Sequence, residues 1–470
     1  MSISYPLSAP IEQIPRLILP KPVAPPKNLP IWKFMQAARD NVLTAIPAPA
    51  YEVPIHSMDM LWFRGFIVSD PEAIGRVLLD NAANYVKAPS ELRFQKPALG
   101  NGLFTSEGAA WRAHRRIMAP AFDMRSLAAY APVITDVAAA LAEDWAALPA
   151  GSVIDVAKAM SRATLQVISR TMFSSDSDGI IGLVRAAFEA YQADLPAGLA
   201  DLLPFLAAWR ERQLVAFGRK VFARFDEAYE ILAAGRVQAT AEGPRDLLSR
   251  LLQARDEEGG GAMSAREVRD QVLTIFLAGH ETTTLALTWV WFLLSQHPAE
   301  EAKLHAELER VLGDRKPSRE DVPQLVYTRR IIEESMRLYP PVASLSLRTA
   351  LASDTLCGER VPPGCMIGIH PWVVHRHHLL WEDPDRFDPD RFTPEKVAAL
   401  PRFAYLPFGG GPRICIGAGF AMLEAMLILA SLAQRFRLRL AEGHVVEPQA
   451  NLTLRARYGM KMVIEPRHGA

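Results

Sequence analysis

The stretch from Phe408 to Gly417, with the sequence FGGGPRICIG, constrains this chain more than any other segment. Its consecutive glycines permit a tight loop that side chains would obstruct, and Arg413 offers a fork of donors that suits a carboxylate. Cys415 follows, just before apolar residues that recur at helical spacing from 418 to about 436. We expect a lowered pKa for its thiol, because the unpaired N–H groups and dipole of a helix N-terminus favour a thiolate.

For a lone cysteine, a buried structural role in a glycine turn is the simpler alternative. The complete pattern Phe-x-x-Gly-x-Arg-x-Cys-x-Gly, however, resembles the haem-binding loop of the cytochrome P-450 family, the haem-thiolate monooxygenases. The resemblance implies that Cys415 is the metal ligand, binding the iron of haem b. Phe408 would then screen the sulfur, Arg413 would pair with a propionate, and Gly417 would let the flat cofactor lie close to the backbone.

Trp111 and Arg115 stand four positions apart in a basic segment and therefore lie on one face of a predicted helix. Alone, this segment is typical of a surface helix with solvated arginines and a tryptophan packed on the core. Beside the cysteine loop it resembles the Trp-x-x-x-Arg element of the family. The resemblance implies that Trp111 and Arg115 hold a haem propionate, which leaves His114 and Arg116 for other roles such as a partner surface.

Ser264 and Glu267 fit the N-cap and N3 positions of a capping box, which predicts the start of a long helix. The helix is expected to continue to about residue 296, and at about 1.5 Å per residue it would measure about 48 Å. That length is enough to cross a whole domain.

The middle of this helix has the sequence AGHETT, from Ala278 to Thr283. Gly279 costs about 1 kcal/mol relative to alanine, so it requires a reason, either close packing or the approach of a ligand to the backbone. A Glu and a Thr in an apolar wall suit proton delivery. The segment resembles the oxygen-activation motif of the family, which implies that Glu281 and Thr282 are catalytic and that Ala278 and Gly279 border the haem.

Glu334 and Arg337 lie three positions apart in a predicted helix. A surface pair of this kind contributes only about 0.2–0.5 kcal/mol to helix stability, and Glu333 could form an equivalent ion pair with Arg337. Together with the later segment around Arg391, the pair resembles a structural element of the family. The resemblance implies a buried network of Glu334, Arg337 and Arg391 that braces the haem loop.

The walls of the substrate pocket are expected in three further segments. Residues 88–106 lack periodicity and predict a long loop that acts as a binding wall or lid. The resemblance assigns a pair of mobile roof helices to residues 188–209, part of the pocket to residues 342–345, and a propionate contact to Arg348.

His375, His377 and His378 are close together in the sequence and invite a metal site. No carboxylate or cysteine cluster with matching spacing accompanies them. We therefore expect exposed histidines in a turn.

Residues 127–255 are rich in Ala and Leu at helical spacing, whereas apolar segments near 366–369 and within 436–464 predict strands. A length of 470 residues by itself favours two or three domains. The resemblance instead implies one mainly α domain with a small β subdomain over residues 51–470, with haem between a long distal helix and a proximal cysteine-ligand helix. Repeated prolines in residues 1–50 predict an extended arm packed on the body, without helix.

Lys plus Arg and Asp plus Glu each total 52, which gives no electrostatic case for a nucleic-acid partner. Three cysteines are too few for a disulfide framework and suit a reducing cytoplasm. The N-terminal region has no apolar run near the roughly 18 residues that a transmembrane anchor needs. We expect a soluble, bacterial-type, cytoplasmic protein.

The resemblance implies a monooxygenase that inserts one atom of O2 into a hydrophobic small molecule, by hydroxylation or epoxidation. Because no flavin or dinucleotide fingerprint follows the cysteine loop, NAD(P)H-derived electrons would come from a separate ferredoxin or flavoprotein reductase. Two alternatives stay open: a haem-thiolate peroxygenase or hydroperoxide isomerase, and a non-catalytic haem-binding protein. Terpenoid, fatty acid, aromatic and macrolide substrates all agree with the sequence.

Overall fold

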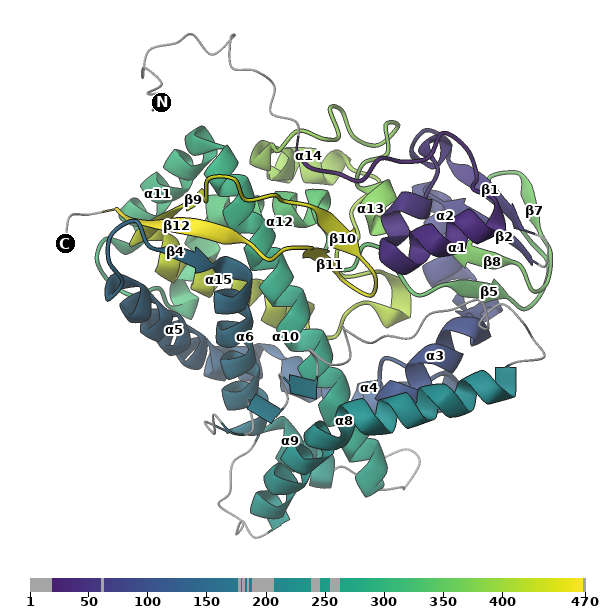
Figure 1. The fold of residues 1–470 in the computed structure, drawn as a ribbon, viewed down its shortest axis with the longest axis horizontal. Coiled ribbons are helices and arrows are strands. Elements are labelled where there is room, and N and C mark those ends of the chain that lie inside the picture. The colour runs from purple at the N-terminus through teal and green to yellow at the C-terminus, as the bar shows by residue number, and fades with distance from the viewer. Residues whose placement is uncertain are drawn as a thin grey trace.

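The computed structural model describes residues 19–60, 63–175, 179, 182–183, 186–187, 207–237, 246–253 and 263–467 of the chain. Helices dominate these residues (Figure 1). They are α1 (Ile31–Asp40), α2 (Pro71–Gly75), α3 (Pro89–Leu99), α4 (Gly108–Met118), α5 (Met124–Ala146), α6 (Val156–Phe173), α8 (Ala207–Val237), α9 (Leu247–Gln253), α10 (Ala265–Gln296), α11 (Pro298–Leu312), α12 (Val326–Leu338), α13 (Pro371–Val374), α14 (Pro394–Ala399) and α15 (Ala418–Ala433).

The strands are short and form small sheets, of which the one with β9 and β12 packs against the helices α10 and α6. They are β1 (Ile55–Met60), β2 (Phe63–Val68), β3 (Tyr85–Lys87), β4 (Val153–Asp155), β5 (Arg348–Ala350), β6 (Asp354–Leu356), β7 (Glu359–Val361), β8 (Met366–Gly368), β9 (Phe436–Leu440), β10 (Pro448–Ala450), β11 (Leu454–Ala456) and β12 (Lys461–Pro466). The largest sheet has the order β1-β2-β8-β5-β3, with only β2 and β8 parallel. A second sheet has the order β4-β12-β9, and β6-β7 and β10-β11 form separate pairs.

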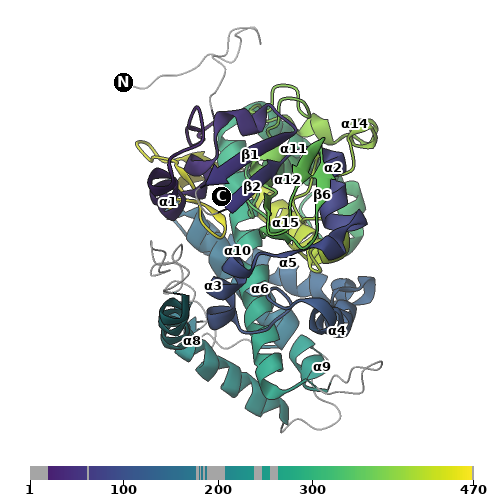
Figure 2. The same ribbon diagram turned by 90° about the vertical axis from the view of Figure 1, so that its right-hand side faces the viewer.

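The long helix α10 begins as predicted and passes through the middle of the molecule (Figures 1 and 2). Ser264 and Glu267 form the reciprocal capping box, and the helix has 32 residues. It packs against α6, α12 and α15, and side chains on all of its faces are buried along most of its length. A helix that is apolar all round belongs in the core, so α10 is the element on which the others are assembled.

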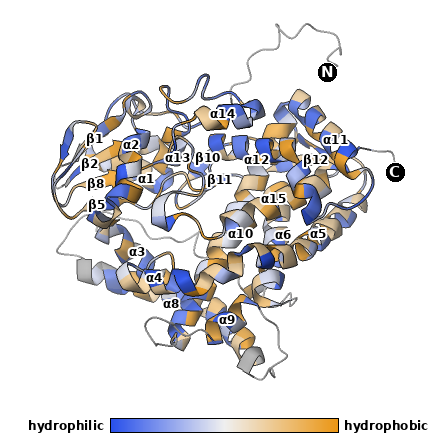
Figure 3. Cartoon of the chain, turned by 180° about the vertical axis from the view of Figure 1, so that it is seen from behind, coloured by the Kyte–Doolittle hydropathy of each residue, from blue (hydrophilic) through white to orange (hydrophobic). Residues whose placement is uncertain are grey.

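Apolar surfaces of neighbouring helices complete this core. The ribbon of α15 is largely orange in Figure 3, and most of its residues after the first turn are buried. Among the described helices, α5 is long and apolar enough to cross a membrane by length and composition. It packs instead against α15 and α6, and Ile134, Val137 and Ala138 have almost no exposed surface. Such burial is typical of a core helix in a globular protein.

Residues 89–99 form the helix α3, where we predicted part of a loop over 88–106. Pro89 occupies the first helical position, where its missing N–H is not needed, and Glu91 lies in the first turn, where the helix dipole favours a carboxylate. The helix stops at Gly100, which has a φ of 69°. Only residues after Gly100 form the expected loop. α3 packs against α8, and the two helices lie next to each other in Figures 1 and 2.

The N-terminal arm is described from residue 19 onward. Leu19 is buried, and the Tyr339 hydroxyl donates a hydrogen bond of 2.9 Å to the carbonyl of Pro20. Residues 19–30 contain no helix or strand, but α1 starts directly after Pro30. The expectation of an arm without helix was therefore wrong for α1, because no proline lies between Pro30 and Pro47 and the helix fits into that interval.

Candidate active site

A cavity of about 370 Å³ lies between α10 and the loop that precedes α15, and apolar side chains make up most of its wall. Every residue that the sequence marked as a site residue lines it: Trp111, Arg115, Ala278, Gly279, Glu281, Thr282, Arg348, Phe408, Arg413, Cys415 and Gly417. These residues come from segments spread over most of the chain. The fold therefore brings the separate motifs to one place.

The cysteine loop is held in shape by its own backbone and by glycine. The N–H of Cys415 donates to the carbonyl of Phe408 at 2.9 Å, and α15 begins just after Gly417. Gly411 has a φ of 65°, and a Cβ there would lie only 1.8 Å from the carbonyl oxygen of Leu78. A side chain at this position cannot be accommodated without moving the backbone, so glycine is a steric requirement of the loop.

Burial raises the pKa of the Cys415 thiol above its ordinary value, while the N–H of Gly417 and the charge of Arg115 act to lower it. The prediction of a lowered pKa was wrong for the protein alone. The loss of water around the sulfur outweighs the helix N-terminus. The surface that Cys415 keeps exposed lies in the wall of the largely apolar cavity. A metal ion bound there favours the thiolate outright.

The helix α10 supplies a second wall with a carboxyl and a hydroxyl group. Glu281 is 8% exposed, and its Oε1 accepts a hydrogen bond of 2.8 Å from the hydroxyl of Thr453. The Thr282 hydroxyl donates to the carbonyl of Ala278 at 2.7 Å, within the same helix. Both side chains line the cavity, so an acid and an alcohol stand side by side in a largely apolar wall.

Gly279 has a packing reason that the structure makes visible. A Cβ on Gly279 would lie 2.6 Å from Cδ1 of Ile168 on α6. Of the two reasons considered for this glycine, close packing of α10 on α6 is therefore present. Gly279 also lines the cavity, together with Ala278.

Cationic side chains gather at one end of the cavity. The guanidinium carbon of Arg413 lies 4.4 Å from the ring centroid of Trp111, and that of Arg115 lies 6.0 Å from the same ring. Arg115 donates to the carbonyl of Ile414 at 2.8 Å, and Arg413 donates to the carbonyl of Ser106 at 3.1 Å. The predicted pairing of Trp111 and Arg115 on one face is thus present.

Lys87 is a member of this cationic group that the sequence did not reveal. It lies opposite Arg348 in the pairing of β3 with β5, and its ammonium donates to the carbonyl of Phe104. Burial, with Arg413 and Arg348 nearby, lowers the pKa of Lys87 to about 8. No motif points to Lys87, because a lysine at the end of a short strand has no distinctive spacing.

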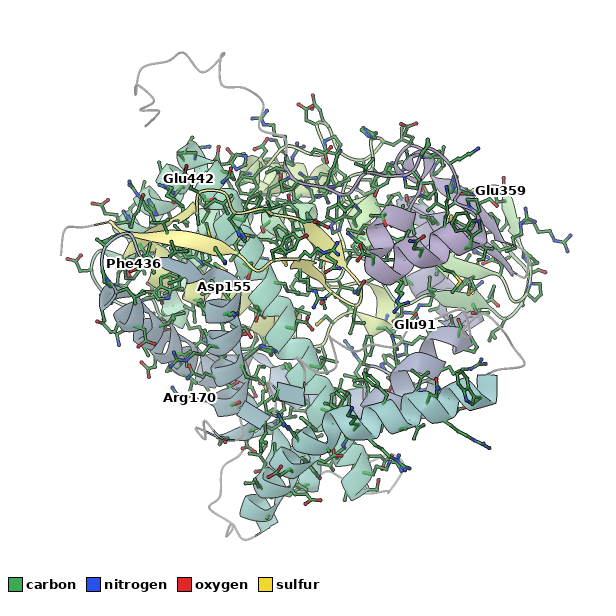
Figure 4. The ribbon with its side chains drawn as sticks, viewed as in Figure 1. Glu91, Asp155, Arg170, Glu359, Phe436 and Glu442 are labelled. Carbon is green, nitrogen blue, oxygen red and sulfur yellow. The ribbon has the colours of Figure 1, made fainter. Side chains whose placement is uncertain are left out.

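Two carboxylates partly balance the cations. Glu107 pairs with Arg413 at 2.8 Å. Glu91 on α3, labelled in Figure 4, accepts from the N–H of Leu347 at 2.7 Å. Burial lowers the pKa of Arg413 to about 10, and burial also lowers the pKa of Arg348. Within the described part of the chain, Nε of Arg348 is buried and has no hydrogen-bond partner.

The four cations Lys87, Arg115, Arg348 and Arg413 face the two carboxylates Glu91 and Glu107, which leaves two positive charges at this end of the cavity. Two propionates would neutralise them and would give buried donors their partners. A sulfur ligand faces the same cavity, whose other walls are apolar. The residues present therefore fit haem b.

A buried ion pair supports the cysteine loop from behind. Arg337 donates to Glu334 at 2.6 and 2.8 Å, and Glu334 also accepts from the N–H of Asp388 at 2.8 Å. Arg391 lies 3.5 Å from the same carboxylate. The predicted network of Glu334, Arg337 and Arg391 is confirmed. The alternative partner Glu333 instead pairs with Arg329 on the surface of the helix, at 2.9 Å.

His375 connects this network to the cysteine loop. The carbonyl of His375 accepts from Arg337 at 2.8 Å, and its Nε2 accepts from the N–H of Leu406 at 3.0 Å. His375 and His377 are buried, so the expectation of exposed turn histidines holds only for His378. The segment that carries them packs into the body, and burial lowers the pKa of His375 to about 3.

His114 was expected to remain available for a partner surface, and it is buried instead. Its Nδ1 lies 3.3 Å from the hydroxyl of Ser106, and its Nε2 lies 3.8 Å from Glu267. The side chain therefore joins α4 to the start of α10. Helical spacing alone does not show this contact, because it depends on how the two helices meet.

Comparison with known proteins agrees with this geometry. The sequence model of the cytochrome P450 family matches residues 23–462. Cyclooctatin synthase of Streptomyces melanosporofaciens is 40% identical over 412 residues, which cover 86% of each chain. Cyclooctat-9-en-7-ol 5-monooxygenase of the same organism is 34% identical over 392 residues, or 81% of each chain.

The crystal structure of the cytochrome P450DA heme domain has the same fold, with a TM-score of 0.77 at 26% sequence identity. The match covers 96% of this chain and 99% of that chain. The predicted fold, mainly α with a small β subdomain, is confirmed. Haem b is its cofactor, and this chain belongs to the cytochrome P450 family as one of its haem-dependent monooxygenases.

Proposed function

We propose that this monooxygenase inserts one atom of O2 into a hydrophobic cyclic hydrocarbon or its alcohol, by hydroxylation or epoxidation. Support comes chiefly from one cavity, in which Cys415 and the pair Glu281 and Thr282 face the same largely apolar space. The name of one relative, cyclooctat-9-en-7-ol 5-monooxygenase, specifies a cyclic, unsaturated alcohol as the substrate of that protein. A substrate of this class suits the apolar walls here.

When bound, haem b would supply the centre that activates O2, and a cysteine thiolate as ligand of its iron would favour cleavage of the O–O bond. In this chain Cys415 would be that ligand. Phe408 would screen the sulfur, and Gly417 would allow close approach of the ring. Ala278 and Gly279 would border it from α10.

The cationic end of the cavity would hold the propionates. Arg115, Arg348 and Arg413 offer guanidinium groups that suit carboxylates. The guanidinium groups of Arg115 and Arg413 lie over the ring of Trp111. Lys87 adds a further charge at the same end. Because these side chains come from α4, β3, β5 and the cysteine loop, binding of the cofactor would fasten four elements together.

Glu281 and Thr282 would carry protons into the cavity. A buried carboxyl group next to a hydroxyl can pass a proton over a short distance without free water. The apolar side chains around them limit the access of water, which protects the reaction from loss of protons and electrons to solvent.

Apolar side chains from three segments would orient the substrate. Leu103 and Phe104 come from the loop after α3, and Val342 and Leu345 come from the segment before β5. Ile275 comes from α10. Most of the roof expected at residues 188–209 lies outside the described residues.

We propose further that a separate ferredoxin or flavoprotein reductase delivers the NAD(P)H-derived electrons, and that the enzyme is soluble and cytoplasmic. Residues 51–470 would form a single haem domain, with residues 1–50 as an arm on its surface. The contacts of Leu19 and Pro20 with the body support this division.

The test begins with purified ferric protein and a library of cyclic olefins, their alcohols, fatty acids, aromatics and macrolides. A low- to high-spin shift identifies ligands that enter the cavity. Turnover is then measured with NAD(P)H, a surrogate ferredoxin with its reductase, and isotopically labelled O2. We expect a product that carries one labelled oxygen atom and requires NAD(P)H.

Turnover with peroxide but never with O2 and a reductase would overturn the proposal in favour of a peroxygenase. Absence of both a spin shift and a product with every donor would overturn it in favour of a non-catalytic haem protein.

A further inference from the structure

The contact between Glu281 and Thr453 joins two parts of the chain that are remote in sequence. The hydroxyl of Thr453 donates to Oε1 of Glu281 at 2.8 Å. Thr453 belongs to the turn between β10 and β11, whereas Glu281 lies in the middle of α10. Both side chains line the cavity. An acid that the proposed function uses is therefore held by a hydroxyl from another element.

The turn that carries Thr453 is anchored on both sides. Before it, the N–H of Ala450 donates to the side-chain oxygen of Asn41 at 3.1 Å. After it, the N–H of Leu454 donates to the carbonyl of Pro341 at 2.9 Å, and the carbonyl of Leu454 accepts from the indole of Trp289 at 3.0 Å. These contacts place the hydroxyl in advance, so little conformational entropy is lost when it binds the carboxyl group.

The same turn also reaches the outside of the protein. Asn451, two residues before Thr453, is exposed, and Thr453 is partly exposed, whereas Glu281 is buried. The Thr282 hydroxyl donates back into its own helix. Thr453 therefore hydrogen-bonds to the buried acid from a turn that is itself partly exposed. A hydroxyl can donate one hydrogen bond while accepting another, as a proton relay requires.

We propose that Thr453 is a positioning residue for Glu281 and the link through which this acid regains its proton from solvent. In this step a hydronium ion gives a proton to the Thr453 oxygen as the hydroxyl proton of Thr453 moves to the Glu281 carboxylate. Water, an unchanged threonine and a carboxylic acid result. The inference rests on the proposed proton-delivery role of Glu281.

Two substitutions separate the hydroxyl from the shape of the side chain. Thr453→Val keeps the branching and removes the hydroxyl, and Thr453→Ser keeps the hydroxyl. Thr288→Val is the matched control, because Thr288 lies on α10 away from the cavity and its hydroxyl donates only within the helix, to Thr284 at 2.7 Å. Haem content and ligand-induced spin shifts of all three variants are measured first.

The decisive readouts are product formed per NAD(P)H consumed, the rate in deuterated water, and the carboxyl stretch of Glu281 in infrared difference spectra. Glu281→Gln identifies the infrared band. A direct general acid contributes about 10²–10⁴ in rate. Because Thr453 would act one step before the acid, we expect the coupling, which is the product formed per NAD(P)H consumed, to fall about ten-fold in Thr453→Val. The solvent isotope effect should grow and the band should shift. Thr453→Ser and Thr288→Val should stay within about two-fold of the wild type.

Unchanged coupling and an unchanged band in Thr453→Val would overturn the inference. A Thr453→Ser variant as defective as Thr453→Val would do the same, because it would assign a structural role to the side chain. If the wild type forms no product from O2, the proposed function fails, and the infrared band still decides whether Thr453 positions Glu281.

Discussion

Arg337 donates to both carboxylate oxygens of Glu334, at 2.6 and 2.8 Å, and neither side chain has any exposed surface. The other guanidinium donors of Arg337 reach the carbonyls of His375, Pro384 and Arg386. A buried ion pair is tolerated only when its donors and acceptors are satisfied, and this one meets that condition. Since His375 also bonds to Leu406, the pair supports the segment that leads into the cysteine loop.

Glu334→Ala should abolish haem incorporation. Removing one partner of a buried ion pair costs about 3–5 kcal/mol, because the remaining charge stays buried and unpaired. Haem per protein and unfolding in urea measure the effect. Arg329→Ala is the control, since Arg329 forms an exposed pair with Glu333 and should change the free energy of unfolding by less than about 1 kcal/mol. A stable, fully haem-loaded Glu334→Ala protein would contradict the structural role.

Cys415→Ser should lose the red-shifted ferrous-CO Soret band that marks thiolate-bound haem. Serine keeps the shape of the side chain but offers a much weaker ligand than a thiolate. Cys357→Ser is the control, because Cys357 is exposed on the turn between β6 and β7 and does not line the cavity. Retention of the band in Cys415→Ser would falsify the ligand assignment.

Arg348→Gln and Arg413→Gln should each release haem faster than the wild type. A hydrogen bond to a charged group contributes about 1.5–3 kcal/mol, which corresponds to about a ten- to hundred-fold change. Transfer of haem to an excess of apomyoglobin measures the rate. Arg112→Gln on the exposed side of α4 should leave the rate unchanged. Equal rates in all three variants would remove these arginines from the propionate site.

Lys87→Met extends the same test to a residue without a motif. Its ammonium shares the cationic end of the cavity with Arg348 and Arg413, which help to lower its pKa to about 8. An anionic cofactor would favour the charged form, so we expect faster release of haem from the variant, measured by the same transfer to apomyoglobin. A release rate equal to that of the wild type would exclude Lys87 from the binding of the propionates.

Glu424→Gln should stabilise the protein increasingly as the pH rises. Burial raises the pKa of Glu424 well above its ordinary value, although the hydroxyl of Thr283 nearby acts to lower it. In the unfolded chain this acid ionises above about pH 4.3, whereas the folded chain keeps the proton. Since the unfolded state binds fewer protons, the wild type loses stability as pH rises from that point towards the folded pKa, and glutamine removes the loss.

Urea unfolding of Glu424→Gln at about pH 5 and about pH 8 measures this difference. Glu442→Gln is the control, because Glu442, labelled in Figure 4, is exposed. A difference between Glu424→Gln and the wild type that does not change with pH would show that Glu424 is ionised in the folded protein.

Local patterns predicted the elements that depend on neighbours in the chain. The capping box of Ser264 and Glu267 opens α10, as the sequence indicated. Residues 89–99 are the opposite case. Their lack of periodicity predicts a loop, whereas the structure has the helix α3, which starts at Pro89.

The sequence by itself determined which residues we propose for the chemistry of the site, because the segments that carry Cys415, Arg413 and the pair Glu281 and Thr282 resemble motifs of the family. Only the tertiary structure decided burial and contacts between distant elements. It raised the pKa of Cys415, buried His375, and placed Lys87 and Thr453 in the cavity. The physical reason is that burial and hydrogen bonds between distant elements depend on how those elements pack. The residues next to a side chain in the sequence do not show this packing.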